Sequence, residues 1–161
     1  MTQFPHDQFA KNLLEVLLSV FGEVHTSLKV VSQVREIDVY FIRNLQHPIP
    51  GSPELGLLAQ LAANSAIFEI FRNPVKLIEV ETCSNKVNDL RAKITNEGKP
   101  EKGSKKITPD LPILWILTPT LSQKNLEYLQ AIDVAKTWGK GVYLLRPQHI
   151  GIVVIHQLPV T

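Results

Sequence analysis

Two acidic residues stand inside runs that are otherwise apolar and strand-like. Asp38 lies in the run Ile-Asp-Val-Tyr-Phe of residues 37–41, and Glu69 lies in the run Ala-Ile-Phe-Glu-Ile-Phe-Arg of residues 66–72. A carboxylate among apolar neighbours is costly unless it is paired, hydrogen-bonded or bound to a metal. Both acids are therefore candidates for chemistry, and the alternative is that a backbone amide or an arginine, Arg35 or Arg72, satisfies each of them.

Metal binding is the chemistry that this pair of acids predicts. Mg²⁺, or Mn²⁺ in its place, takes oxygen ligands and keeps several waters for a phosphate substrate. An ion held by Asp38 and Glu69 would activate water and stabilise the charge on a phosphodiester. Because strand side chains alternate between faces, Asp38 is expected on the face opposite to Ile37, Val39 and Phe41.

Other residue types that bind metals or attack substrates form no motif. The five histidines are widely separated, and there is no glycine-rich phosphate loop or nucleophile elbow. The single cysteine, Cys83, excludes an internal disulfide framework and a cysteine-rich zinc site, and we expect it in the core. Trp138 is expected to pack against the last strands, with stacking on a base or a partner as the alternative.

The elements that must position these residues follow from hydrophobic spacing. Apolar residues recur at helical intervals in three segments, which we predict to be helices: 6–21, 54–63 and 73–94. The first is expected to be amphipathic, to end at Gly22 and to let Lys11 pair with Glu15 one turn away. A short helix is expected after Ser122, with Leu126 and Leu129 on its inner side.

The predicted strands alternate with these helices. The runs 23–31 and 34–44 are separated by a short polar break and predict an antiparallel hairpin. Further strands are expected at 66–72, 111–118, 142–145 and 151–158, and the apolar run 111–118 is typical of a strand buried on both faces. This order predicts a single α/β domain over residues 1–161.

The segment after Asn73-Pro74 has two interpretations. A helix from there to Ile94 is favoured, because the three-four spacing of apolar residues continues well past Cys83. The alternative makes 77–83 a strand, in which Glu79 and Glu81 replace Glu69 as the acids of interest.

The overall composition limits the class of protein. The chain has 161 residues and a net charge of only +2, so a nucleic-acid partner would have to bind a local basic surface. The lysines of residues 99–106 form one such candidate segment for DNA contact, although a solvated connector has the same composition. The single cysteine, the absence of a long apolar segment and the lack of a signal peptide indicate a cytoplasmic protein outside the membrane.

The order of elements and the placing of Asp38 and Glu69 resemble the PD-(D/E)xK nuclease superfamily, with its restriction-endonuclease-like core of helix, three strands, helix and strand. The resemblance covers residues 6–118 and leaves 119–161 as a small strand-containing extension. The opening His-Asp-Gln-Phe-Ala-Lys-Asn-Leu-Leu of residues 6–14 looks like the first helix of the transposase-like, recombination-promoting nuclease branch. The chain is also similar to a group of uncharacterised cyanobacterial proteins, in the segments 6–14, 35–41, 68–74, 114–119 and 156–159.

The resemblance implies roles for individual residues. Asp38 would be the second-strand aspartate and Glu69 the third-strand glutamate, both of them metal ligands. The superfamily's lysine, two residues after the glutamate, is replaced here by Phe71. Lys76 or Lys86, from the following helix, would then supply the cation that stabilises the transition state or orients water, and the sequence does not choose between them. Glu15 is either a third carboxylate or a surface residue.

These observations predict a metal-dependent nuclease that acts on phosphodiester bonds of nucleic acid, with DNA as its expected partner. The alternative is a non-catalytic protein of the same fold that serves as a binding or self-association module, including as a homo-oligomer. A third interpretation is an unrelated α/β fold in which the two acids coincide by chance.

Overall fold

The computed structural model describes residues 5–30, 35–44, 46, 56–97 and 110–159. Up to Thr118 the described elements are α1 (Pro5–Leu18), β1 (Gly22–Val30), β2 (Arg35–Arg43), α2 (Gly56–Leu61), β3 (Ala66–Ile70), α3 (Leu77–Glu97) and β4 (Ile113–Thr118). Beyond it they are α4 (Gln123–Tyr128), β5 (Ile132–Asp133), α5 (Ala135–Trp138), β6 (Val142–Leu144), β7 (Ile150–Val154) and a 3-10 turn (Ile155–Gln157).

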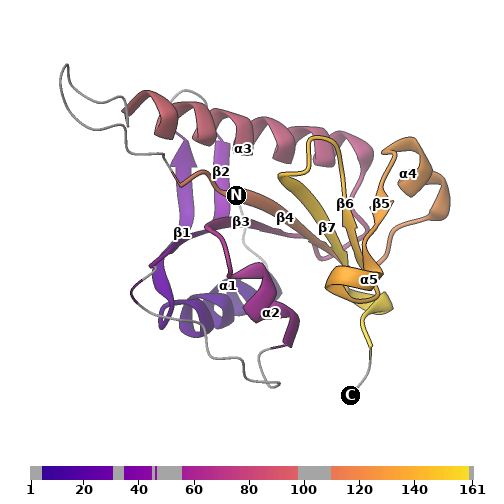
Figure 1. The fold of residues 1–161 in the computed structure, drawn as a ribbon, viewed down its shortest axis with the longest axis horizontal. Helices are drawn as coiled ribbons and strands as arrows, with labels where there is room; N and C mark the ends of the chain where they lie inside the picture. The colour runs from indigo at the N-terminus through magenta and orange to yellow at the C-terminus, as the bar shows by residue number, and fades with distance from the viewer. Residues whose placement is uncertain (1–4, 31–34, 45, 47–55, 98–109, 160–161) are drawn as a thin grey trace.

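All seven described strands belong to one mixed sheet in the order β1-β2-β3-β4-β7-β6-β5. The strands β1, β2 and β3 pair antiparallel, whereas β3-β4 and β4-β7 are parallel. Figure 1 shows α3 lying along one side of this sheet and α1 and α2 on the other. The predicted α/β class and the antiparallel hairpin are therefore confirmed, and the strands after β4 extend the same sheet.

The two faces of the sheet bury separate apolar cores. Helix α3 covers one core with its stripe Val80, Cys83, Val87 and Leu90, against Ile67 and Ile116. The other core lies beneath α1 and α2 and contains Leu18, Leu61, Val39, Phe41, Phe68 and Trp115. Cys83 is buried in the first core, as predicted, and Trp138 packs against Trp115 at 5.1 Å between ring centroids in the second.

The apolar side chains on one half of the β1-β2 hairpin pack into a different core from those on the other half. In β2, Val39 and Phe41 pack with the α1 core, but Ile37 packs with the α3 core. In β1, Val24 and Leu28 divide in the same way. The prediction that Ile37 shares a face with Val39 and Phe41 is therefore wrong, because the alternation of faces breaks between residues 37 and 39, at Asp38 itself. The neighbouring strand is irregular at the same level: Ser27 lies between the β1 partners of Val39 and Ile37 and has a φ of 54°.

Helix α3 settles the alternative over residues 77–83 in favour of a helix. Its start is later than predicted: the helix begins at Leu77, and Asn73-Pro74 precede it without capping it. The Glu79 side chain accepts a hydrogen bond from the Lys76 backbone N–H at 3.0 Å, as in a capping box. Glu79 and Glu81 therefore lie on a helix and do not replace Glu69 as strand acids.

Other boundaries differ in smaller ways. Helix α1 ends at Leu18 and not at Phe21, and β5 and α5 were not predicted. The strand expected at 66–72 ends at Ile70, and the strand expected at 151–158 becomes β7 and the 3-10 turn. The short helix capped by Ser122, with Leu126 buried, is confirmed. The whole lysine segment 99–106 lies outside the described residues. Among those described, no helix is long and apolar enough to cross a membrane.

Close packing of β7 against β4 gives a stability test of the fold. A Cβ atom added at Gly151 would lie 2.2 Å from the Trp115 ring, so Gly151→Ala must displace a fully buried indole. We expect Gly151→Ala to lower the free energy of unfolding by about 1–3 kcal/mol, measured by urea denaturation. In a Trp115→Phe background the smaller ring should reduce that cost, and an unchanged cost would show that the indole is not the obstacle.

Candidate functional site

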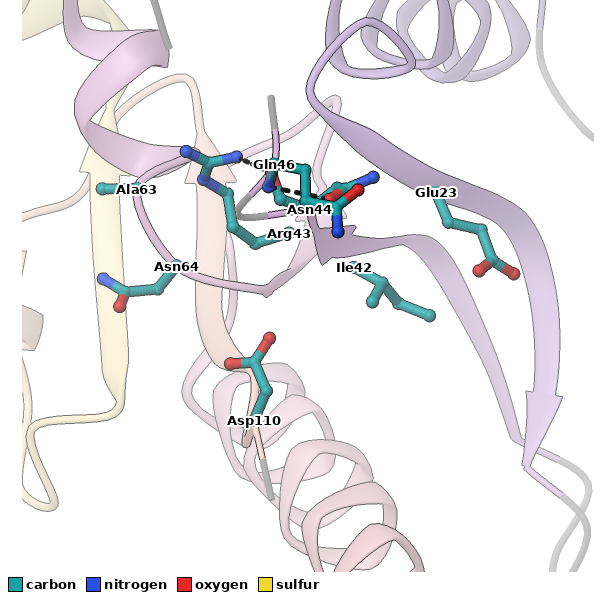
Figure 2. Close-up of a pocket in the computed structure, with 8 residues that line it drawn as sticks. All are labelled: Glu23, Ile42, Arg43, Asn44, Gln46, Ala63, Asn64 and Asp110. Atoms are coloured by element: carbon teal, nitrogen blue, oxygen red, sulfur yellow. Dashed lines mark hydrogen bonds between the residues drawn. The ribbon is translucent and has the colours of Figure 1, made fainter. Parts of the chain in front are cut away.

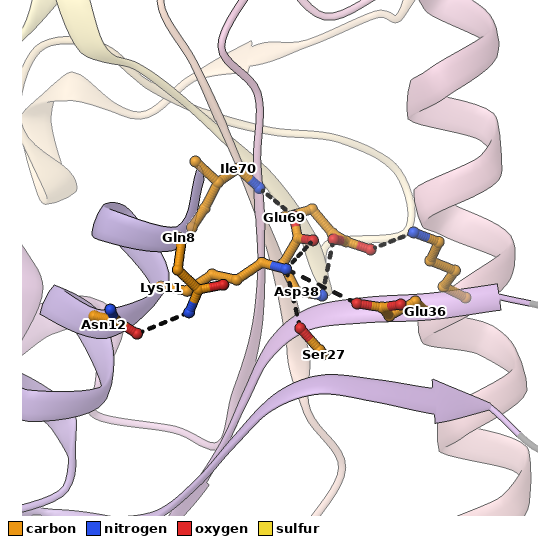
Figure 3. Close-up of polar contacts among 9 residues, drawn as sticks. Gln8, Lys11, Asn12, Ser27, Glu36, Asp38, Glu69 and Ile70 are labelled. Carbon is orange, nitrogen blue, oxygen red and sulfur yellow. Dashed lines mark hydrogen bonds and ion pairs between the residues drawn. The ribbon is translucent and has the colours of Figure 1, made fainter. Parts of the chain in front are cut away.

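Asp38 and Glu69 lie next to each other where β2 and β3 stop pairing. The last ladder pair is Val39 with Phe68, so the next pair along the two strands is Asp38 with Glu69. There the carboxylates replace the backbone acceptors of the ladder. The Asp38 N–H donates to Glu69 Oε2 at 3.2 Å, and the Ile70 N–H donates to Asp38 Oδ2 at 2.9 Å. Each carboxylate thus accepts an amide of the other strand, and together they hold the strand ends in place (Figure 3).

Glu69 is almost completely buried, with 2% of its surface exposed. Its Oε1 accepts a hydrogen bond from Lys86 Nζ of α3 at 2.8 Å. Burial, followed by the charge of Asp38 beside it, raises the pKa of Glu69 to about 8, although Lys86 acts in the opposite direction. Burial alone would lower the pKa of Lys86, but the Glu69 carboxylate outweighs it and the net shift is upward. The pair of acids therefore binds positive charge readily, as a proton or as a cation.

Lys11, on α1, is a second cation at this site that sequence reasoning missed. Its side chain is 95% buried, and its ammonium donates a hydrogen bond to Ser27 Oγ at 3.1 Å. The same nitrogen lies 3.5 Å from Asp38 Oδ1 and 3.9 Å from Glu36 Oε1. Figure 3 shows Lys11 pointing to all three of these residues. The predicted pair of Lys11 with Glu15 does not form, and Glu15 is exposed.

The change of face at Asp38 explains how both helices reach one site. Asp38 lies where β2 passes from the α1 core to the α3 core, so it meets Lys11 from α1 and Glu69, with Lys86, from the α3 side. Ser27 lies between Thr26 and Leu28, whose β2 partners Val39 and Ile37 flank Asp38, and its backbone has a φ of 54°. Few non-glycine residues adopt this conformation, and such outliers cluster at functional sites.

The structure brings some of the predicted residues together and leaves others apart. Lys86 contacts Glu69, whereas Lys76 lies exposed just before α3, ten residues earlier or roughly 15 Å along the helix axis. Phe71 packs into the α3 core on the Glu69 side of the sheet. Arg72 is exposed, and the Arg35 side chain lies outside the described parts of the structure. Of the two candidate lysines, geometry therefore favours Lys86.

The carboxylates suit a hard divalent cation. The Asp38 side chain is 26% exposed and is the solvent side of the pair, so an ion would approach from there. A carboxylate oxygen that accepts one hydrogen bond keeps a further lone pair, which leaves both acids able to ligate. Over the described parts of the chain, no group of three or more His, Cys, Asp or Glu side chains is placed to hold a metal. An ion here would depend on two acids, with water and substrate as its other ligands.

A separate hollow of about 650 Å³ lies at the other end of β2 (Figure 2). It is lined by Glu23, Ile42, Arg43, Asn44, Gln46, Ala63, Asn64 and Asp110. Two of its lining residues are joined through the Ser65 hydroxyl, which accepts the Arg43 N–H at 2.8 Å and donates to Asp110. Neither Asp38 nor Glu69 lines the hollow, so it is not part of the candidate site.

Comparisons with known proteins give a weak structural likeness and no sequence match. No family model and no curated protein matches the sequence. Among solved structures the chain is similar to the crystal structure of a repair endonuclease from Pyrococcus abyssi, with a TM-score of 0.49 and 11% identity. The match covers 98% of this chain and 49% of that chain, so this chain spans about half the length of that protein. At this TM-score and identity the likeness does not bear on activity.

The ion pair between Lys86 and Glu69 gives a stability prediction. Lys86→Met leaves a buried carboxyl without its ammonium, and we expect it to lower the free energy of unfolding by about 3 kcal/mol at pH 9 in metal-free buffer. Lys93→Met, on an exposed position of the same helix, is the control and should stay within about 0.5 kcal/mol of the wild type. Adding Glu69→Gln to Lys86→Met should recover part of the loss.

The same variant has an expected pH dependence. The pKa of Glu69 is raised from an ordinary 4.5 to about 8, so folding takes up a proton between these values and stability from this group falls as pH rises through them. At pH 5 the protonated carboxyl does not need the ammonium, and Lys86→Met should cost less than at pH 9. Equal costs at both pH values, from urea denaturation, would show that Glu69 stays charged throughout.

Proposed function

We propose that this protein is a metal-dependent nuclease of the PD-(D/E)xK type, which hydrolyses phosphodiester bonds of nucleic acid with Mg²⁺ or Mn²⁺. One observation carries this proposal: Asp38 and Glu69 lie side by side at the splayed ends of β2 and β3, with a lysine on each acid. Paired acids beside ammonium groups are suited to a site that must bind both a cation and a phosphate.

Each residue has a distinct role in this proposal. Asp38 and Glu69 would hold the ion, and Lys86 would take the part of the lysine that Phe71 replaces in the strand. The hydrogen bond of 2.8 Å from Lys86 fixes the Glu69 carboxylate. In this proposal the Lys86 ammonium would also offset the negative charge that develops on the phosphate during hydrolysis. The ion itself would supply Lewis acidity and lower the pKa of bound water.

The reaction proposed is hydrolysis. Water adds to phosphorus, the bond from phosphorus to one ester oxygen breaks, and that oxygen leaves with a proton that comes from water. The protein's own residues orient the phosphate and stabilise its added charge through the ammonium groups. DNA is the proposed substrate, and a cytoplasmic location is the proposed setting.

A specific observation favours a second candidate, a non-catalytic protein of this fold that binds a partner or a second copy of itself. Every oxygen of the two carboxylates already has a partner within the protein: Lys11 and the Ile70 N–H at Asp38, and Lys86 and the Asp38 N–H at Glu69. An internally satisfied cluster of this kind also serves simply to fix the strand ends.

Nuclease activity separates the two candidates. Purified protein is incubated with supercoiled plasmid and single-stranded DNA in Mg²⁺ or Mn²⁺, beside Asp38→Asn, Glu69→Gln and Lys86→Met. We expect cleavage that chelator abolishes and that each substitution lowers about 100-fold or more. Asp38→Asn and Glu69→Gln each remove a carboxylate ligand of the ion, and Lys86→Met removes an ammonium that stabilises the transition state. Lys76→Met is the matched control and should cleave like the wild type.

Circular dichroism and urea denaturation confirm that each variant is folded. Cleavage that survives equally in all variants would come from a contaminant. Absence of cleavage in folded wild-type protein on DNA and RNA would favour the non-catalytic candidate, and equal loss in Lys76→Met and Lys86→Met would remove the special role of Lys86.

A further inference from the structure

The second lysine of the site, Lys11, is unusual because its ammonium group is buried. A buried ammonium is costly, and proteins offset that cost with nearby carboxylates or hydrogen bonds. Lys11 has three oxygen neighbours, one for each N–H: Ser27 Oγ at 3.1 Å, Asp38 Oδ1 at 3.5 Å and Glu36 Oε1 at 3.9 Å. Only 5% of its side chain is exposed, against 26% for Asp38 and 35% for Glu36. The lysine thus lies beneath the two acids, and the acids face solvent.

This arrangement matches what a second metal ion needs. In sites with two metals the ions lie about 3.5–4 Å apart, a spacing that one carboxylate can span with its two oxygens. Asp38 is the acid that would be shared here, because it has Glu69 on one side and Glu36 on the other, with Lys11 between Asp38 and Glu36. An ammonium already lies where a second cation would find its ligands.

The net charge of the site also disfavours a second divalent ion. When ionised, Glu36, Asp38 and Glu69 carry three negative charges, and Lys11 and Lys86 carry two positive charges. The cluster is left with one negative charge, which a single divalent ion reverses to one positive charge. A second ion would leave three positive charges in a half-buried site, which Coulomb repulsion at this range disfavours.

We propose that the Lys11 ammonium takes the place of a second metal ion, so that the site binds one divalent cation, at Asp38 and Glu69, and none at Asp38 and Glu36. The inference rests on the proposed function, because it assumes that the first ion binds. It assigns to α1 a fixed positive charge that lies beneath Asp38 and Glu36, on the side away from solvent. Lys86 remains the ammonium hydrogen-bonded to Glu69.

The number of bound ions tests the inference without an activity assay. Mn²⁺ is the probe, because it takes the same oxygen ligands and free Mn²⁺ is counted directly by electron paramagnetic resonance. We expect about one Mn²⁺ per wild-type chain and about two per chain in Lys11→Met, which frees Asp38 and Glu36 for a second ion. Lys93→Met removes an equal charge at a distant exposed position and should still bind about one.

Two further variants identify where the extra ion binds. Lys11→Met with Glu36→Gln should return to about one ion, because the second site loses a ligand, and Lys11→Arg should bind about one, because the positive charge remains. If Lys11→Met does not fold, the wild-type count still decides, since two ions per chain would overturn the inference and one would support it.

The outcomes distinguish this inference from the proposed function. A wild-type chain that binds no Mn²⁺ overturns the metal site itself, and the inference with it. A wild-type chain that binds two, or a folded Lys11→Met that still binds one, overturns only the role given to Lys11 and leaves the nuclease proposal intact.

Discussion

The Asp38 and Glu69 carboxylates are held against each other at the end of a sheet, and that proximity is unfavourable in the absence of positive charge. The surrounding structure supplies such charge twice, once from each layer of helices: Lys11 from α1 and Lys86 from α3. Neither lysine is near the acids in sequence. The position of each helix layer relative to the sheet therefore decides whether the two carboxylates have positive charge beside them. The placement of α1 and α3 on opposite faces is thus tied to one electrostatic requirement.

A regular hairpin would not meet that requirement, because each residue of a regular strand faces one layer or the other and never both. The break in alternation at Asp38 removes this restriction and lets a single residue contact groups from both sides of the sheet. The acids also replace ladder hydrogen bonds there, so the strands separate without leaving the Asp38 and Ile70 amides unsatisfied. Asp38 and Glu69 therefore both accept backbone hydrogen bonds and pair with the two lysines.

Much of the framework was predictable, because helix α3 and the apolar strands around Asp38 and Glu69 have periodic patterns that dominate their local structure. The cation from α1 was not predictable. Helix α1 is apolar on two sides, so spacing alone did not show which side is buried: Lys11 turns inward, and Phe9 and Leu13 are exposed. The face change at Asp38 was equally hidden, because the alternation argument assumes a regular strand without interruption. Tertiary contact, and not local pattern, decides both features.

Ser27 has a consequence beyond its hydrogen bond to Lys11. β1 is the outermost strand at its end of the sheet, nine residues long, and a regular strand in that position offers a row of backbone donors and acceptors to another chain. The φ of 54° at Ser27 interrupts that row near its middle. The irregularity that accommodates the site therefore also makes the edge a poor template for intermolecular β-pairing, so local backbone strain contributes to resistance against aggregation.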